Sequence, residues 1–162
     1  MKSPYLFKIR IKKYRILQHL ASCMLDPEPV FREMIKIKND VPQDLYGYYI
    51  RGMYQMNTYG LSKEVALKAF EGIPKRRLME KSELKKYESL PDKIVIYRGT
   101  TDLETDPGLS WSLNINVAKK YYRGALLSAE IEKQQIIALF EQNTCEEEVL
   151  ANLNKRQITQ IA

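Results

Sequence analysis

The chain has 162 residues, of which 44% are hydrophobic and 28% are charged, and its formal net charge is +6. This composition suits one compact domain, or one domain with a small helical extension, and there is no low-complexity tract or Gly/Ser-rich linker. No apolar run approaches the roughly 20 residues of a membrane span, and basic residues interrupt every apolar stretch of residues 1–25. We therefore expect no signal peptide and a cytoplasmic chain.

The N-terminal half has the apolar spacing of amphipathic helices, with hydrophobic residues three or four positions apart. Ser62 is a typical helix cap, and Gly60 and Gly72 are typical stops. Helices are predicted over 12–24, around Phe31, over 42–59, between Ser62 and Gly72, and over 74–87, the last one charged and exposed.

The pattern changes at Pro91, where β-branched runs replace helical spacing. Strands are predicted over 93–97, 108–113, 125–131, 135–140, 147–150 and 157–161, with a short helix that starts at Asn114 or Asn116. Helices followed by strands indicate an α+β chain rather than alternating βαβ units. We therefore divide the chain into a helical N-terminal portion, 1–90, and a β-rich core, 91–162, which together form one compact domain. No Gly-rich phosphate loop supports a Rossmann or P-loop site.

Charge is distributed unevenly between these portions. Residues 1–90 contain 18 Lys and Arg against 10 Asp and Glu, whereas residues 91–162 contain 8 against 10. A basic half beside a mildly acidic half suggests two roles: the first half would hold a polyanion or an acidic protein surface, and the second a chemical site. The alternative is that the Lys-rich helices are simply solvated surfaces.

Metal and Ser-His-Asp chemistry are not expected. The two cysteines, Cys23 and Cys145, lie far apart and have no second Cys or His at metal-ligand spacing. His19 is the only histidine and lies in an amphipathic pattern, so it does not suggest a catalytic triad.

Three short segments carry the functional signal. The first is the strand end Tyr97-Arg98-Gly99-Thr100, the second is Gly108-Leu-Ser-Trp-Ser-Leu113, and the third is Glu146-Glu-Glu-Val-Leu150. Each is common by itself: an Arg that ends a strand is usually a surface residue, and an acidic triplet is usually a solvated edge. Their order and spacing make them informative.

In that order, the segments resemble the Arg–Ser–Glu class of ADP-ribosyltransferases, the family of cholera-like and clostridial toxins, with bacterial and phage members most similar. The resemblance covers roughly residues 93–152, and residues 1–90 resemble nothing comparable. It implies NAD as the cosubstrate, no metal, and a mixed, split β-sandwich with a cleft between its sheets, on which the N-terminal helices pack.

The resemblance assigns a role to each matching position of the first two segments. Arg98 corresponds to the family arginine that holds the NAD phosphate and ribose region, and a planar cation with several donors suits an anionic ligand. Gly99 would let the backbone approach the nicotinamide amide, because it has no Cβ. Ser110 would support the nicotinamide pocket and orient the catalytic acid, with Ser112 as a secondary structural member. Trp111 departs from the usual Thr, and alternation places it on the opposite strand face.

Glu148 corresponds to the catalytic glutamate, the last acid before Val-Leu. Cleavage between ribose and nicotinamide builds positive charge on the sugar, and a nearby carboxylate stabilises it. Glu146 lies two positions earlier on the same strand face and would assist the attacking group, as in arginine-modifying members. Glu147 points the other way and is expected to be solvated. Tyr121 falls where family aromatics pack on the ligand, although a ring that covers the sheet explains it equally well.

The resemblance thus implies a mono-ADP-ribosyltransferase that modifies a macromolecule, a protein arginine being favoured and a nucleic acid possible, without a membrane partner. An NAD glycohydrolase that uses water is a close variant. The alternative of another class is an inactive NAD fold or a nucleic-acid-binding module that uses the basic half. The sequence leaves the acceptor open.

Overall fold

A computed structural model of the chain describes residues 26–56, 58–101, 108–141 and 147–162. It divides the chain into two compact units, Met1–Leu78 and Met79–Ala162. The division comes before residue 90, where sequence patterning placed it, because the helix over 81–89 contacts the sheet of the second unit. The helix predicted over 12–24 lies outside the described residues.

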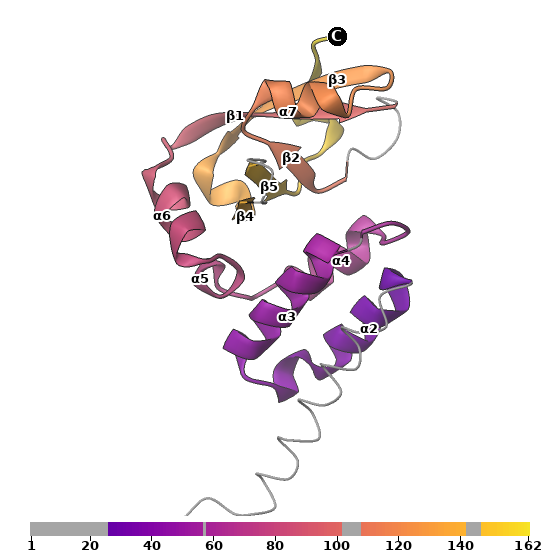
Figure 1. The fold of residues 1–162 in the computed structure, drawn as a ribbon, viewed down its shortest axis with the longest axis vertical. Helices are drawn as coiled ribbons and strands as arrows, with labels where there is room; N and C mark the ends of the chain where they lie inside the picture. The colour runs from indigo at the N-terminus through magenta and orange to yellow at the C-terminus, as the bar shows by residue number, and fades with distance from the viewer. Residues whose placement is uncertain (1–25, 57, 102–107, 142–146) are drawn as a thin grey trace, which may run out of the picture. The chain divides into compact units, whose positions relative to one another are not determined.

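The helical unit, as far as it is described, contains four α-helices and one 3-10 turn (Figure 1). They are α2 (Pro27–Ile37), η1 (Lys38–Asp40), α3 (Gln43–Met56), α4 (Lys63–Phe70) and α5 (Lys75–Leu78). The predicted cap is confirmed: the Ser62 side chain accepts a hydrogen bond from the Val65 N–H at 3.4 Å, where α4 begins. Gly72 directly follows Glu71, the C-cap of α4, and has positive φ, as expected of a residue that ends a helix. Gly60 also has positive φ, but α3 ends at Met56, four residues before it.

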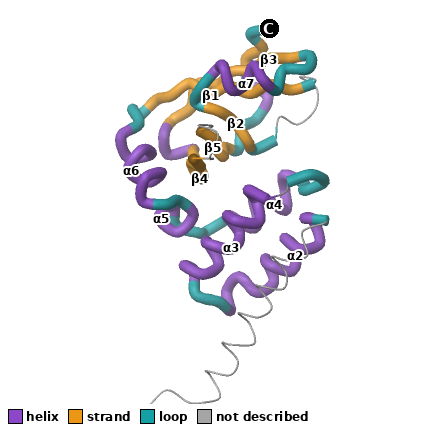
Figure 2. Tube along the Cα trace, in the orientation of Figure 1, coloured by secondary structure: helices purple, strands orange, loops and turns teal. Residues whose placement is uncertain are grey.

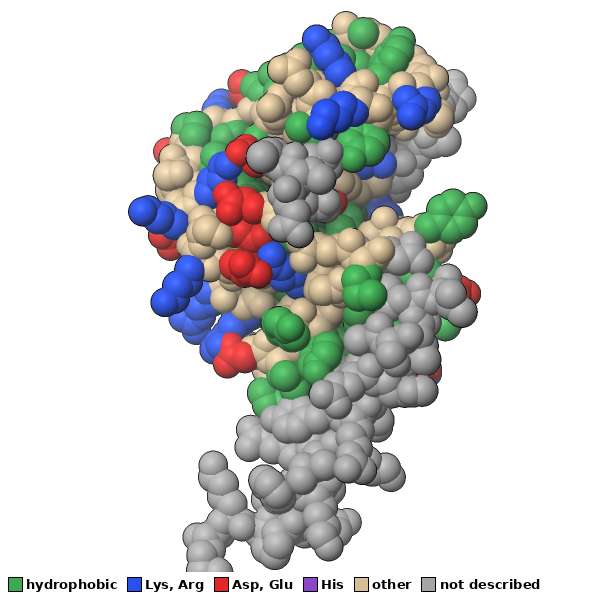
Figure 3. Space-filling model, in the orientation of Figure 1, with side chains coloured by type: hydrophobic (Ala, Val, Ile, Leu, Met, Phe, Trp, Pro, Cys, Tyr) green, Lys and Arg blue, Asp and Glu red, His purple; other side chains and the backbone are tan. Residues whose placement is uncertain are grey.

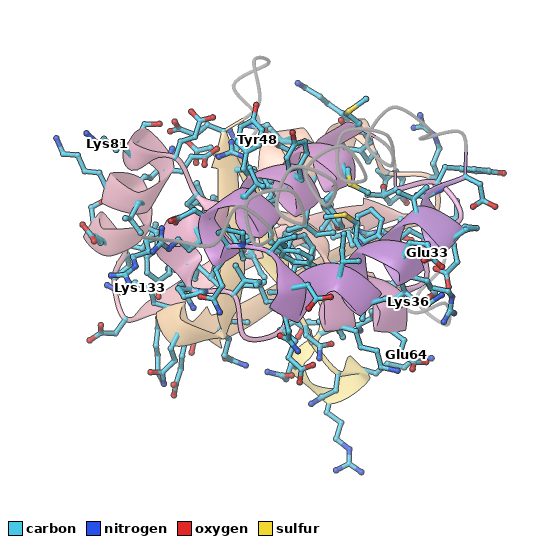
Figure 4. The ribbon with its side chains drawn as sticks, turned by 90° about the horizontal axis from the view of Figure 1, so that it is seen from below. Glu33, Lys36, Tyr48, Glu64, Lys81 and Lys133 are labelled. Atoms are coloured by element: carbon cyan, nitrogen blue, oxygen red, sulfur yellow. The ribbon has the colours of Figure 1, made fainter. Side chains whose placement is uncertain are left out.

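Large apolar side chains from three helices form the core of this unit. Phe31 of α2, Ile50 of α3 and Phe70 of α4 are all buried. The Tyr46 ring is fully buried, and its hydroxyl donates to the Ala69 carbonyl at 3.2 Å. Burial raises the pKa of the Tyr46 phenol well above its usual range. On the outside, Glu33 and Lys36 extend together from α2 and form an exposed ion pair (Figure 4).

Two glycines of α3 differ sharply in their surroundings, which gives a matched pair of substitutions. A Cβ at Gly47 would overlap the carbonyl oxygen of Arg77 in α5, whereas a Cβ at Gly52 would meet no heavy atom within 4 Å. We expect Gly47→Ala to lower the free energy of unfolding by about 1–3 kcal/mol through overpacking. Gly52→Ala should raise it by about 0.5–1 kcal/mol, because alanine favours a helix interior. Urea unfolding followed by far-UV circular dichroism measures both, and effects of the same sign would contradict the packing at Gly47.

The second unit contains two α-helices, two 3-10 turns and one six-stranded sheet, as far as it is described (Figure 2). The helices and turns are α6 (Lys81–Ser89), α7 (Ile115–Lys120), η2 (Lys133–Gln135) and η3 (Lys155–Gln157). The strands are β1 (Lys93–Thr100), β2 (Ser110–Ser112), β3 (Ala125–Glu132), β4 (Ile136–Glu141), β5 (Glu147–Ala151) and β6 (Thr159–Gln160). The α+β class is thereby confirmed.

The strand order is β4-β5-β2-β1-β3-β6, and every neighbouring pair is antiparallel. The predicted mixed sheet is therefore wrong for the described strands. A mixed sheet would contain at least one parallel pair, which needs a long crossover connection. Each pair of neighbouring strands here runs in opposite directions.

Strands β1 and β2 share the shortest pairing in the sheet. Strands β1 and β3 pair along eight residues and β2 and β5 along three, but β1 and β2 share one residue pair, Tyr97 opposite Ser112. The sheet thus consists of two halves, β6-β3-β1 and β2-β5-β4, that meet at this pair. Two separate sheets were expected from the resemblance, but the described strands form one sheet with this thin junction.

Alternation along β1 separates a buried face from an outer face. Ile94 and Ile96 are buried, whereas Lys93 and Val95 are exposed. Arg98 follows Ile96 by two positions and therefore starts from the buried face. None of the described helices is long and apolar enough to cross a membrane.

Candidate functional site

The three segments that carry the functional signal lie on adjacent strands. Glu148 follows Arg98 by 50 residues in the sequence, but their strands, β5 and β1, flank β2 on either side. Tyr97 pairs with Ser112, and Ser112 pairs with Glu148. Side chains directly opposite each other on antiparallel strands lie about 5 Å apart at Cβ. The sheet therefore brings the three segments together at its junction.

Arg98 connects β1 to β2 through its side chain. Its Nη1 donates a hydrogen bond to the backbone carbonyl of Ser110. The guanidinium also lies against Gly108, where a Cβ would come 3.2 Å from Nη2. Gly108 has a φ of 71°, a conformation that favours glycine. A glycine at this position therefore serves both the backbone conformation and the space that the guanidinium occupies.

The Ser-Trp-Ser strand supports both the sheet and the next helix. The buried Ser112 hydroxyl accepts a hydrogen bond from the Asn114 N–H at 3.0 Å. Asn114 in turn caps α7, because its side chain accepts from the Asn116 N–H at 2.9 Å. Of the two predicted starts of this helix, Asn114 is the one observed. Ser110 is half-buried and holds Arg98 through its carbonyl, and Trp111 is buried.

Glu148 is half-buried in the middle of the sheet half that contains β5. Its direct neighbours across the strands are Ser112 of β2 and Phe140 of β4, both buried. Glu146 lies outside the described residues, so its predicted place beside Glu148 stays a prediction.

The predicted site residues do not all start from one face of the sheet. Ser112 and Glu148 share a face because they pair directly. Arg98 follows Tyr97, which pairs with Ser112, so its side chain leaves the opposite face. Its guanidinium reaches β2 at the carbonyl of Ser110, the first residue of that strand.

The structure gives Gly99 a packing role. A Cβ at this position would overlap the Ala118 carbonyl oxygen and come within 2.6 Å of backbone atoms of Tyr121 and Tyr122. The space on the Cβ side of Gly99 is thus filled by backbone at the end of α7. The expected approach of the Gly99 backbone to nicotinamide stays a prediction. Tyr121 is 53% exposed and Tyr122 is 44% exposed at the end of this helix. The Tyr121 side chain, which is predicted to contact a ligand, is therefore accessible.

One acidic residue beside the site was interpreted wrongly. Glu147 is not simply solvated: its carboxylate forms an ion pair with the Lys86 ammonium of α6. The two residues are 61 positions apart, and no local pattern indicates such a pair. The spacing of Glu80 and Glu83 does match a capping box, and that was the available signal for the start of α6.

Within the described residues, no group of three or more His, Cys, Asp and Glu is arranged to hold a metal ion. Comparison of the chain with protein-family models, with curated proteins and with solved structures found no match.

Proposed function

We propose that the chain is a mono-ADP-ribosyltransferase that transfers ADP-ribose from NAD to a macromolecule, with protein arginine as the favoured acceptor. The observation that supports this most is the adjacency of β1, β2 and β5. It places the Arg98, Ser110 and Glu148 segments side by side, and the sequence resemblance names these same three segments. We also infer that this unit has a fold of the ADP-ribosyltransferase type, in which one six-stranded sheet takes the place of the expected two.

Arg98 is the anchor for the pyrophosphate in this proposal. A guanidinium carries five N–H donors in a planar fork, enough to hold the Ser110 carbonyl and a phosphate oxygen together. The bond to Ser110 fixes the direction of the side chain before the ligand arrives. A fixed donor loses less conformational entropy on binding than a mobile one.

Glu148 is the catalytic carboxylate. In the reaction, the bond between the ribose carbon and the nicotinamide nitrogen breaks, and the bonding electron pair leaves with nicotinamide. The acceptor nitrogen forms the new bond to that carbon and releases a proton. Positive charge builds on the sugar in between, and a carboxylate held by the sheet stabilises it without reorganising. Ser112 and Phe140 flank Glu148 and restrict its position.

The test is incubation of the full chain with NAD labelled in its adenylate part, together with cell lysate. Label should appear on a macromolecule, and nicotinamide should be released. Nicotinamide release without any labelled acceptor would instead assign an NAD glycohydrolase. A wild-type chain that shows neither label transfer nor nicotinamide release would refute the proposal.

A nucleic-acid-binding module is the competing function. The basic N-terminal half supports it, but the positive charge is distributed unevenly within that half. Residues 26–78 contain nine Lys and Arg against seven Asp and Glu. Six basic residues and no acidic ones precede Asp26, outside the described residues. Salt-sensitive binding of RNA or DNA that survives Arg98→Ala and Glu148→Gln, with no NAD turnover, would favour this function.

A further inference from the structure

Two glutamates face each other at the ends of β4 and β5. Glu141 pairs directly with Glu147 across these antiparallel strands. Like charges directly opposite each other destabilise a strand pair. The next pair along the same strands is Phe140 with Glu148, so any separation at the glutamate pair displaces the proposed catalytic carboxylate.

A single lysine of α6 compensates this repulsion. The Lys86 ammonium forms an ion pair with Glu147 and lies 3.8 Å from the Glu141 carboxylate. The three side chains are only 28%, 33% and 41% exposed, in the order Lys86, Glu147, Glu141, so water screens them incompletely. On the face drawn in Figure 3, acidic side chains gather next to basic ones over α6 and β4.

Helix α6 is fixed to the sheet on both sides of Lys86. At the first turn, the buried Glu83 carboxylate accepts from the Glu80 N–H at 2.6 Å and from the Glu141 N–H of β4 at 2.8 Å. Beyond the last turn, the Lys133 ammonium donates to the Leu90 carbonyl at 2.8 Å. Lys86 is therefore carried by a helix whose position against β4 is set by other residues.

Glu147 connects α6 to β2, because its side chain pairs with Lys86 and its backbone bonds at the end of β2. Its carbonyl accepts a hydrogen bond from the Leu113 N–H at 3.3 Å, one residue beyond the pair that Ser112 forms with Glu148. The side chain of Glu147 is thus held by α6 while its backbone is held by β2. Glu148 is the next residue of β5, so its backbone position depends on how Glu147 is held.

We propose that Lys86 is a positioning residue for Glu148: it neutralises the Glu141–Glu147 pair and so keeps the start of β5 in register with β2 and β4. The role in catalysis rests on the proposed function, whereas the charge compensation does not. The experiment therefore has one arm that needs no activity.

The first arm measures thermal unfolding of the full chain by the fluorescence of Trp111, the single tryptophan, which is buried in β2. Lys86→Met keeps the length of the side chain and removes its charge, and it should lower the unfolding midpoint by roughly 4 °C or more. Adding Glu141→Gln to Lys86→Met should restore most of this loss, because one of the two facing charges is then gone. Lys86→Arg should behave like the wild-type chain.

Lys81 supplies the matched control. It lies on the same helix and is exposed, with its side chain extending away from the molecule (Figure 4). Lys81→Met removes one positive charge from α6 without touching the glutamate pair, and its midpoint should stay at the wild-type value. An equal loss in both variants, or no recovery with Glu141→Gln, would overturn the charge compensation.

The second arm measures NAD cleavage by the same variants. Lys86→Met should lower kcat about tenfold through displacement of Glu148, with KM for NAD close to the wild-type value because Arg98 is untouched. Lys86→Arg and the Lys86→Met/Glu141→Gln double variant should recover kcat. Unchanged kcat in Lys86→Met would refute the positioning role. A wild-type chain without NAD turnover would refute the proposed function and the positioning role, and the unfolding arm would still decide the charge compensation.

Discussion

Gly99→Ala is expected to lower the free energy of unfolding of the Met79–Ala162 unit by about 3 kcal/mol or more. The added methyl group would collide with three backbone atoms, from Ala118, Tyr121 and Tyr122. Backbone cannot move aside by a change of rotamer, so either α7 leaves the sheet or β1 bends. Both responses disturb Arg98, the residue that precedes Gly99 in the strand.

Tryptophan fluorescence during urea unfolding measures this loss. Gly52→Ala, in an open position of α3, is the control, because it makes the same chemical change without a collision. A Gly99→Ala variant with the stability of the wild-type chain would show that α7 does not lie on β1 as described. The expected loss is independent of any enzymatic activity.

Glu148→Gln is expected to lower the rate of NAD cleavage by about 100-fold, the scale on which loss of one electrostatic stabiliser of a transition state acts. The substitution keeps the shape of the side chain and removes its charge, so the sheet should remain folded. KM for NAD should change little, since the charge on the sugar appears in the transition state and not in the bound substrate.

Nicotinamide release under saturating NAD gives kcat for the variant and the wild-type chain. The control is Glu130→Gln, which removes an exposed carboxylate from β3 whose ion pair with Lys93 is also exposed. Transfer by Glu148→Gln at the wild-type rate would contradict the assignment of Glu148. A variant that loses both activity and its unfolding transition would show a structural role instead.

Local patterns predicted a helix or strand well where the residues of that segment alone determine it. The β-branched run after Pro91 predicted a strand over 93–97, and β1 occupies Lys93–Thr100. The segment over 125–131 is likewise found as β3, Ala125–Glu132. One boundary was missed: the helix predicted over 74–87 is two helices, α5 and α6, because Glu80 starts a new helix through a capping box. Glutamate is not among the preferred helix caps, so its signal was weak.

Features that depend on distant partners could not be predicted from one sequence. The placement of β5 beside β2 depends on which strands pair, and the period of two along each strand does not specify a partner. The same holds for Lys86 and Glu147, and for Gly99, whose neighbour is the backbone of α7. The resemblance named the site residues, but it could not show that Arg98 leaves the sheet from the face opposite Glu148.

The single residue pair between β1 and β2 has a consequence for cooperativity. Each half of the sheet has its own internal ladder, and the Tyr97–Ser112 pair and the Arg98 side chain link them. Segments with few shared contacts open as separate units. If NAD binds as proposed, its contacts with Arg98 of β1 and Glu148 of β5 would add a further link between the two halves, and they would then open together.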